Sequence, residues 1–136
     1  MELILSATCE DARVRPDGKL DLMGVFSQLQ ARDFPALQER MTVAFLIEWD
    51  AGEHGRHDLR ADLIGTDGRE VLTIEGHTEV GRGPAAGAHP QTRLIMPLKN
   101  VVFPRAGTYR FELNVGSTRR RGCSVHVEHA PDASAS

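Results

Sequence analysis

The chain has 136 residues, of which 40% are hydrophobic and 26% are charged, and its formal net charge is −3. That length suits a single domain, and a hydrophobic share near the globular average excludes a wholly disordered chain. The small negative charge excludes a general basic field that would attract nucleic acid or anionic lipid, and no run approaches the ~20 apolar residues that a membrane-spanning helix needs.

The start of the chain lacks the pattern of a secretory signal. An acid, Glu2, stands where a signal peptide carries basic residues, and Ser6 soon interrupts the apolar run. The two cysteines, Cys9 and Cys123, are too few for a disulfide scaffold. We therefore expect a cytoplasmic protein whose cysteines are reduced core residues. Because both fall in terminal strands that often neighbour each other, a disulfide between them is the alternative.

Apolar and polar residues alternate along most of the chain, with glycine, proline and aspartate between the alternating segments. This period of two is typical of β-strands with one face in a core and the other in water. In the clearest segment, residues 107–116, apolar residues alternate with Arg110, Glu112 and Asn114. The pattern predicts eight strands, over residues 2–9, 20–28, 41–49, 58–65, 70–80, 92–98, 107–116 and 122–129.

Repeated strands without a helical pattern predict an all-β fold. We expect a two-layer antiparallel β-sandwich of immunoglobulin-like or related topology over residues 1–129, with a closed barrel as the main alternative. Residues 130–136 are small and polar, and we expect them to form a flexible tail. The glycine-rich residues 81–87 follow a strand and lead into no helix, so we interpret them as a flexible surface loop and not as a phosphate-binding loop.

Two apolar segments depart from simple alternation. Residues 41–49 are apolar on both faces, so this strand needs a cover on each side, supplied either by a strap of residues 29–40 or by another subunit. Residues 101–104 form an apolar connector. Because Pro97 and Pro104 each lack a backbone donor, this connector suits a sheet edge or a plugging loop.

Three short motifs stand out: Cys9-Glu10-Asp11-Ala12, Ile74-Glu75-Gly76-His77 and Val102-Phe103-Pro104-x-x-Gly107-x-Tyr109-Arg110-Phe111. They resemble a set of small bacterial proteins of unknown function, and the resemblance extends over residues 7–127. It implies a compact β-sandwich and carries no activity or site. The pattern Pro-x-x-Gly-x-Tyr-x-Phe also resembles the penultimate strand of many immunoglobulin-like modules, which is a packing signature.

Loop placement predicts one end of the fold where polar side chains gather. In an antiparallel succession of strands, every second connection lies at the same end, so the connection around Asp17 and the loops over residues 50–57, 81–90 and 116–121 should share one end. Imidazole and carboxylate groups there could bind zinc, and carboxylates alone could bind calcium. Because His54 and His57 lie in a loop without helical geometry, we interpret this end as a solvated polar loop and assign no metal site, with metal binding as the alternative. The candidate residues for a metal are Asp50, Glu53, His54, His57, Asp58 and His89.

One charge run, Arg119-Arg120-Arg121, lies near the last predicted turn. Arginine binds phosphate or carboxylate in a fork, so a nucleotide, nucleic acid or acidic protein could be its partner. Basic residues also keep a hairpin tip soluble. No aromatic residues are interleaved with the run and the chain is net acidic, which argues against nucleic-acid binding.

No catalytic constellation is evident from the residues. The nucleophile motif Gly-x-Ser-x-Gly is missing, and no motif calls for a cofactor. We expect a non-catalytic protein-interaction or assembly module, which could be homo-oligomeric, because the doubly apolar strand and the apolar connector offer surface to another chain. The alternative is a small-ligand or metal-binding sandwich that uses the loops at one end, with these contact residues: His54, His57, His89, Arg119, Arg120 and Arg121.

Overall fold

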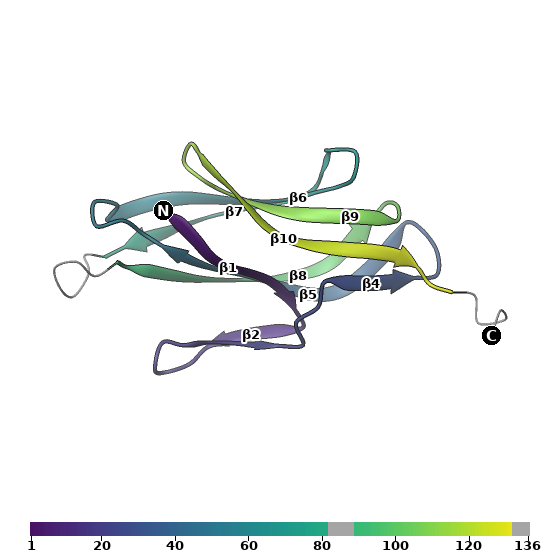
Figure 1. Ribbon diagram of the computed structural model, residues 1–136, viewed down its shortest axis with the longest axis horizontal. Helices are drawn as coiled ribbons and strands as arrows, with labels where there is room; N and C mark the ends of the chain where they lie inside the picture. Colours follow the sequence, from purple (N-terminus) through teal and green to yellow (C-terminus); the bar gives the residue numbers. More distant parts are fainter. Residues whose placement is uncertain (82–88, 132–136) are drawn as a thin grey trace.

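The fold is all-β. The computed structural model describes residues 1–81 and 89–131, and within them the chain forms ten strands and no helix (Figure 1). The strands are β1 (Glu2–Cys9), β2 (Asp11–Val14), β3 (Leu20–Met23), β4 (Gln28–Ala31), β5 (Ala36–Glu48), β6 (Gly55–Ile64), β7 (Glu70–Val80), β8 (Gln91–Phe103), β9 (Gly107–Val115) and β10 (Thr118–His129). No helix that could cross a membrane is found in the described ranges. The loop predicted over residues 81–87 and the tail predicted over residues 130–136 fall largely outside the described residues.

The strands form three sheets. One sheet has the order β1-β5-β8, a second has the order β4-β10-β9-β6-β7, and β2 pairs only with β3. Neighbouring strands are antiparallel except for β4 and β10, which are parallel, so the expectation of a wholly antiparallel fold was wrong at this pair. Among the described residues no sheet closes on itself into a ring, unlike the closed-barrel alternative.

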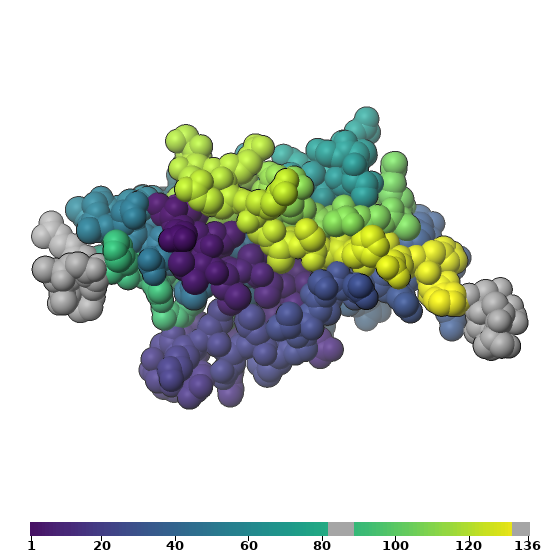
Figure 2. Space-filling model, viewed as in Figure 1, coloured from purple at the N-terminus to yellow at the C-terminus, as the bar shows by residue number. Residues whose placement is uncertain are grey.

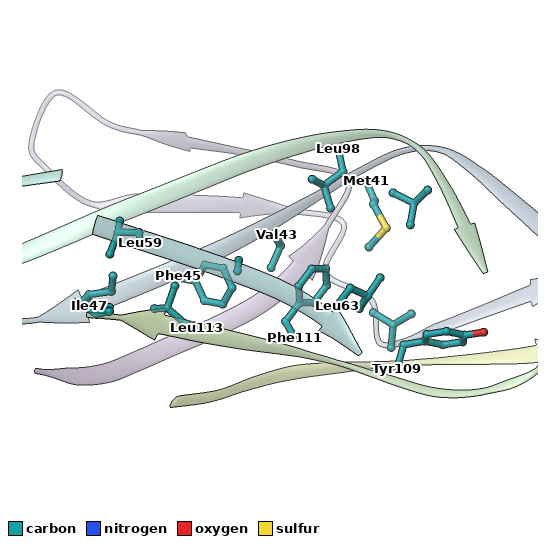
Figure 3. Packing of buried hydrophobic residues seen from close by; sticks show 14 of the residues in the cluster. Met41, Val43, Phe45, Ile47, Leu59, Leu63, Leu98, Tyr109, Phe111 and Leu113 are labelled. Atoms are coloured by element: carbon teal, nitrogen blue, oxygen red, sulfur yellow. The ribbon is translucent and has the colours of Figure 1, made fainter. Parts of the chain in front are cut away.

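The core consists of side chains from both larger sheets (Figure 3). Phe45 of β5 and Phe111 of β9 are fully buried and meet edge to face, with ring centroids 6.5 Å apart. A β-bulge in β10 brings Gly122 close to this pair. A Cβ at Gly122 would lie 3.0 Å from the carbonyl oxygen of Phe111 and 3.2 Å from the Phe45 ring, so the close approach of β10 favours glycine here.

A buried tyrosine ties the turn after β8 to the start of β9. The hydroxyl of Tyr109 donates a hydrogen bond to the carbonyl oxygen of Arg105 over 2.6 Å and accepts one from its amide over 3.2 Å. The Tyr109 ring packs edge to face on Phe103, with centroids 4.9 Å apart. The hydroxyl is therefore satisfied by local backbone while the ring contributes to the core.

The doubly apolar segment 41–49 is covered by the same chain, but not by the predicted strap. β2 contacts both β5 and β8, so the β2–β3 hairpin lies against the outer side of the three-stranded sheet (Figure 1). Thr42 and Ala44 are buried on that side. Residues 29–40 do not form a strap, because residues 28–31 pair with β10 as β4 and residues 36–40 already belong to β5.

Two further boundaries differ from the prediction. The strand predicted over residues 20–28 divides into β3 and β4, since Gly24 adopts a positive φ of 65° that ends β3. The apolar connector belongs to a strand: Val101 to Phe103 are the last residues of β8, which lies at the edge of its sheet. The strand predicted over residues 92–98 therefore extends to Phe103.

Candidate functional site

Trp49 lies at the centre of the predicted loop end. It directly follows β5, is fully buried, and its indole Nε1 donates a hydrogen bond to the Thr92 hydroxyl over 2.8 Å. Its amide donates to the carbonyl oxygen of Pro90 over 2.8 Å. The alternation that makes β5 apolar therefore continues to Trp49, which connects the β5–β6 loop with the residues that precede β8.

Two of the predicted histidines contact Trp49. The His57 ring stacks on the indole, with centroids 4.4 Å apart and planes inclined by 23°. His57 Nε2 lies 2.7 Å from the carbonyl oxygen of Glu53, and His89 Nδ1 lies 3.2 Å from the carbonyl oxygen of Trp49. His54 is exposed. In the described residues, no three His, Cys, Asp or Glu side chains are grouped so that they could hold a metal ion.

The carboxylates of the β5–β6 loop face the amino group of Met1. This amine lies 2.7 Å from Glu53 Oε1 and 3.4 Å from Asp50 Oδ2. The hydrogen bond to Glu53 raises the pKa of the amine. Arg120 of β10 donates a hydrogen bond to the carbonyl oxygen of Met1 over 3.2 Å. The loop predicted to carry metal ligands is thus joined to β10 through the first residue.

The three arginines lie on β10 itself and not at the hairpin tip, which is formed by Gly116 and Ser117. Arg119 donates to the Asn114 side chain over 3.2 Å, and Arg120 reaches Met1. Arg121 is exposed. Because alternate residues of a strand point to opposite faces, Arg119 and Arg121 lie on the outer face of the five-stranded sheet.

Two carboxylates that sequence reasoning missed are buried on this outer face. Asp62 of β6 and Glu112 of β9 are directly opposite each other across neighbouring strands. Asp62 accepts hydrogen bonds from Arg60 Nε over 3.2 Å, from the Thr73 hydroxyl over 2.9 Å and from the Asn114 amide over 3.1 Å. These donors compensate the carboxylate for its loss of water.

Glu112 is less completely satisfied. Arg110 donates to its Oε1 over 2.8 Å, and Arg119 Nε lies 3.5 Å from its Oε2. Among the described residues, Glu112 Oε2 and Arg110 Nε are buried atoms without a hydrogen-bond partner. Such buried atoms are uncommon in folded proteins, and in the part of the chain that the structure describes both of them belong to this network.

A groove of about 790 Å³ opens beside this network, next to the β9–β10 turn. Its charged and polar side chains include Asp58, Arg60, Glu75, Asn114 and Arg119. Opposite charges are therefore mixed within it. The groove can accept a polar ligand or a side chain of another protein, and its lining contains one of the predicted contact residues, Arg119.

The large apolar side chains that are exposed lie outside the five-stranded sheet. In the described part of the chain, the large hydrophobic side chains with the greatest exposure all lie on β1, the β2–β3 hairpin and its exit, β5 or β8: Ile4, Leu5, Val14, Met23, Val25, Leu37 and Val102. Val25 is 61% exposed and Leu37 is 57% exposed. Leu37 and Val102 are also cross-strand partners. The five-stranded sheet contributes none of these residues.

A family model described as a family of unknown function, DUF6941, matches residues 4–128. The chain belongs to this family. The resemblance to proteins of unknown function is thereby confirmed at the level of the family. No curated protein and no solved structure matches the chain.

In this DUF6941 domain, the loop end brings together only some of the predicted residues. His57 and His89 meet at Trp49, and Arg120 approaches the same end through Met1, whereas Arg119 belongs to the outer-face network. Sequence reasoning missed Asp62 and Glu112 because each occupies a polar position of an alternating strand. The available signal was their placement in two long strands, but their burial depends on which strands are neighbours.

Proposed function

We propose that this domain is a non-catalytic module that binds another protein through the side carrying the β2–β3 hairpin. The observation that supports this function is the exposure of Val14, Met23 and Val25 at this hairpin, with Ile4 and Leu5 exposed on β1. Exposed apolar surface is costly to leave in water and is typical of protein-binding sites when it is contiguous. The partner that fits this surface is a protein with an apolar patch of its own.

The state of the buried carboxylates supports a non-catalytic role. Asp62 is held by Arg60, Thr73 and Asn114, and Glu112 is paired with Arg110. A general acid or base needs a proton that it can exchange with a substrate. Carboxylates held in ion pairs are instead suited to fixing the positions of arginines.

The test compares a double variant, Met23→Ser with Val25→Ser, against a control variant, His77→Ser, on the exposed part of β7. Each protein is used to capture partners from cells that express it, and the captured proteins are quantified by mass spectrometry. We expect a partner that the wild type and the control retain and that the double variant loses, and the purified partner should show the same order of affinity. Equal capture by all three proteins would contradict the proposal. Thermal melting checks that each variant is folded.

A second candidate function is binding of a small ligand or metal at the loop end and the adjoining groove. The groove lined by Arg60 and Arg119 favours a phosphorylated or carboxylated ligand, because guanidinium groups bind such anions in a fork. Thermal shift with nucleoside phosphates and divalent metals tests it. A stabilisation that Arg119→Gln removes would favour the ligand function, and an unchanged melting temperature with every compound would exclude it.

We also propose that the fold is a two-layer sandwich of immunoglobulin-like topology. In immunoglobulin domains, the third strand of the fold lies in one sheet with the last two strands. Here β6, the third long strand after β1 and β5, lies in one sheet with β9 and β10, and β1, β5 and β8 form the other sheet. These strand orders support the proposal. The hydrogen bond from Tyr109 to Arg105, four residues upstream, matches the tyrosine corner of that fold. A crystal structure tests this topology, and a different strand order would refute it.

The proposed location is the cytoplasm. Cys9 and Cys123 are both free thiols, which supports a reducing compartment. Burial raises the pKa of both thiols and so keeps them protonated and slow to react. Fractionation of cells that express the protein tests this, and its recovery from a secreted or envelope fraction would overturn it.

A further inference from the structure

The outer face of the five-stranded sheet is ordered in rows across the strands. Strand register places Arg119, Asn114, Arg60 and Glu75 side by side in one row, from β10 through β9 and β6 to β7. In the next row the same strands contribute Arg121, Glu112, Asp62 and Thr73. Each row therefore begins with a guanidinium on β10.

The two sides of this face carry opposite charge. On β10, Arg121 is exposed and the Arg119 side chain is 65% exposed. On β7, Glu75 and Glu79 are four residues apart and lie on the same face of the strand. Within the described residues, Arg121, Glu75 and Glu79 form no ion pair, so these charges are available to another molecule.

Between the two charged sides, the centre is largely neutralised by its own contacts. The carboxylates of Asp62 and Glu112 are compensated by Arg60 and Arg110. The β9–β10 turn (yellow-green) and the β6–β7 turn (teal) stand out along the upper edge of Figure 2. A surface with one basic side, one acidic side and a neutralised centre is complementary to itself when one copy is turned over.

We propose that this outer face binds the same face of a second copy, about a two-fold axis that lies between β6 and β9 and runs parallel to the strands. Rotation about that axis places β7 of one copy over β10 of the other, on both sides of the interface. Glu75 of each copy then lies over Arg119 of the other. A two-fold axis perpendicular to the strands would instead place β10 of one copy over β10 of the other, where their arginines would repel each other. The charges therefore favour the axis that runs parallel to the strands.

The centre of the proposed interface adds no attraction of its own. Rotation about the axis brings β6 of the second copy over β9, so Asp62 of one copy lies over Glu112 of the other. Arg60 and Arg110 neutralise these two carboxylates within each copy. The attraction between the copies therefore comes from the two charged sides, where Glu75 faces Arg119.

The test uses two charge-reversed double variants of the full chain. One carries Arg119→Glu with Arg121→Glu, which makes both sides of the face acidic, and the other carries Glu75→Arg with Glu79→Arg, which makes both sides basic. We expect the wild type to be a dimer in sedimentation analysis, and its dissociation constant to rise at least about tenfold when salt is increased from about 0.05 M to about 0.5 M. Each variant alone should be monomeric, and an equimolar mixture of the two should form a heterodimer.

A monomeric wild type at low salt, or a mixture that stays monomeric, would overturn the proposal. If Arg119→Glu disturbs folding through its contact with Glu112, the neutral pair Arg119→Gln with Arg121→Gln gives the same measurement and should still weaken the dimer about tenfold. This surface is separate from the apolar side of the proposed function. The variant Val25→Ser should therefore dimerise normally, and loss of the dimer in that variant would assign self-association to the apolar side and overturn the charged-face dimer.

Discussion

The imidazole of His57 lies flat on the indole of Trp49, with ring centroids 4.4 Å apart and planes inclined by 23°. Trp49 is the single tryptophan of the chain, so tryptophan fluorescence reports on the surroundings of this indole. The stacked imidazole covers one face of the indole, so its removal changes the surroundings that the emission senses.

We predict that the variant His57→Gln changes the emission spectrum of Trp49, because it replaces the ring that stacks on the indole with an amide. The control His54→Gln alters an exposed histidine of the same loop and should keep the wild-type spectrum. Fluorescence spectroscopy of the folded proteins measures the effect, and an unchanged spectrum for His57→Gln would show that the stacked ring does not affect the indole.

Asp62 should be important for stability although it lies on the outer face. The variant Asp62→Ala leaves Arg60, Thr73 and Asn114 without their shared acceptor, and we expect a loss of about 3 kcal/mol in the free energy of unfolding. Asp58 on the same strand is the matched control, because its side chain is 81% exposed and pairs only with Arg56. Denaturant unfolding measures both variants. Equal losses would show that the Asp62 network adds no stability.

The hydroxyl of Tyr109 should stabilise the turn after β8. The variant Tyr109→Phe keeps the ring in the core but removes both hydrogen bonds to Arg105, so we expect a loss of about 1–2 kcal/mol. The loss should be the same at neutral and mildly acidic pH, since no charge is removed. Thermal and denaturant unfolding measure it. A variant as stable as the wild type would mean that water replaces the hydroxyl without cost.

The β6–β7 turn should give the protein an acid-sensitive stability contribution. A hydrogen bond from the amide of Arg69, together with the nearby Arg105 and Arg69 charges, lowers the pKa of Asp67 below its ordinary value of 3.8. Because the folded state favours the carboxylate, this contribution is complete above pH 3.8 and disappears as the pH falls through the lower folded pKa.

The variant Asp67→Asn should therefore be less stable than the wild type at neutral pH, and the difference in melting temperature should shrink below pH 3.8. Melting curves over a series of acidic buffers measure this. A difference that stays constant with pH would show that the stability effect does not depend on ionisation of Asp67.

The sequence predicted some strands correctly and missed others. Alternation correctly indicated strands at β6, β7 and β9, because in each of them alternate residues are apolar and face the core. It did not indicate β2, whose four residues Asp11–Val14 are mostly exposed and pair only within a hairpin. The parallel pairing of β4 with β10 also gave no local signal, since it joins segments from opposite ends of the chain.

In the candidate site, too, the sequence predicted what depends on the succession of strands and loops and missed what depends on contacts between distant strands. Loop alternation correctly expected His57 and His89 at one end, and they meet at Trp49. The burial of Asp62 and Glu112 could not be predicted, because a polar residue in an alternating strand is exposed or buried according to the side chains on the neighbouring strands. The order of the strands in the sheet decides which residues are neighbours, and the alternation of apolar and polar residues does not reveal that order.

The pairing of β4 with β10 has a consequence for synthesis of the protein. Leu29 is opposite Val127, so β4 cannot pair with β10 until almost the whole chain has emerged from the ribosome. Contacts so distant in sequence form slowly, and unpaired strand edges are prone to join other chains. The nascent protein is therefore most vulnerable to aggregation just before its final strand is made, and arrival of β10 completes the five-stranded sheet from β4 to β7 in a single step.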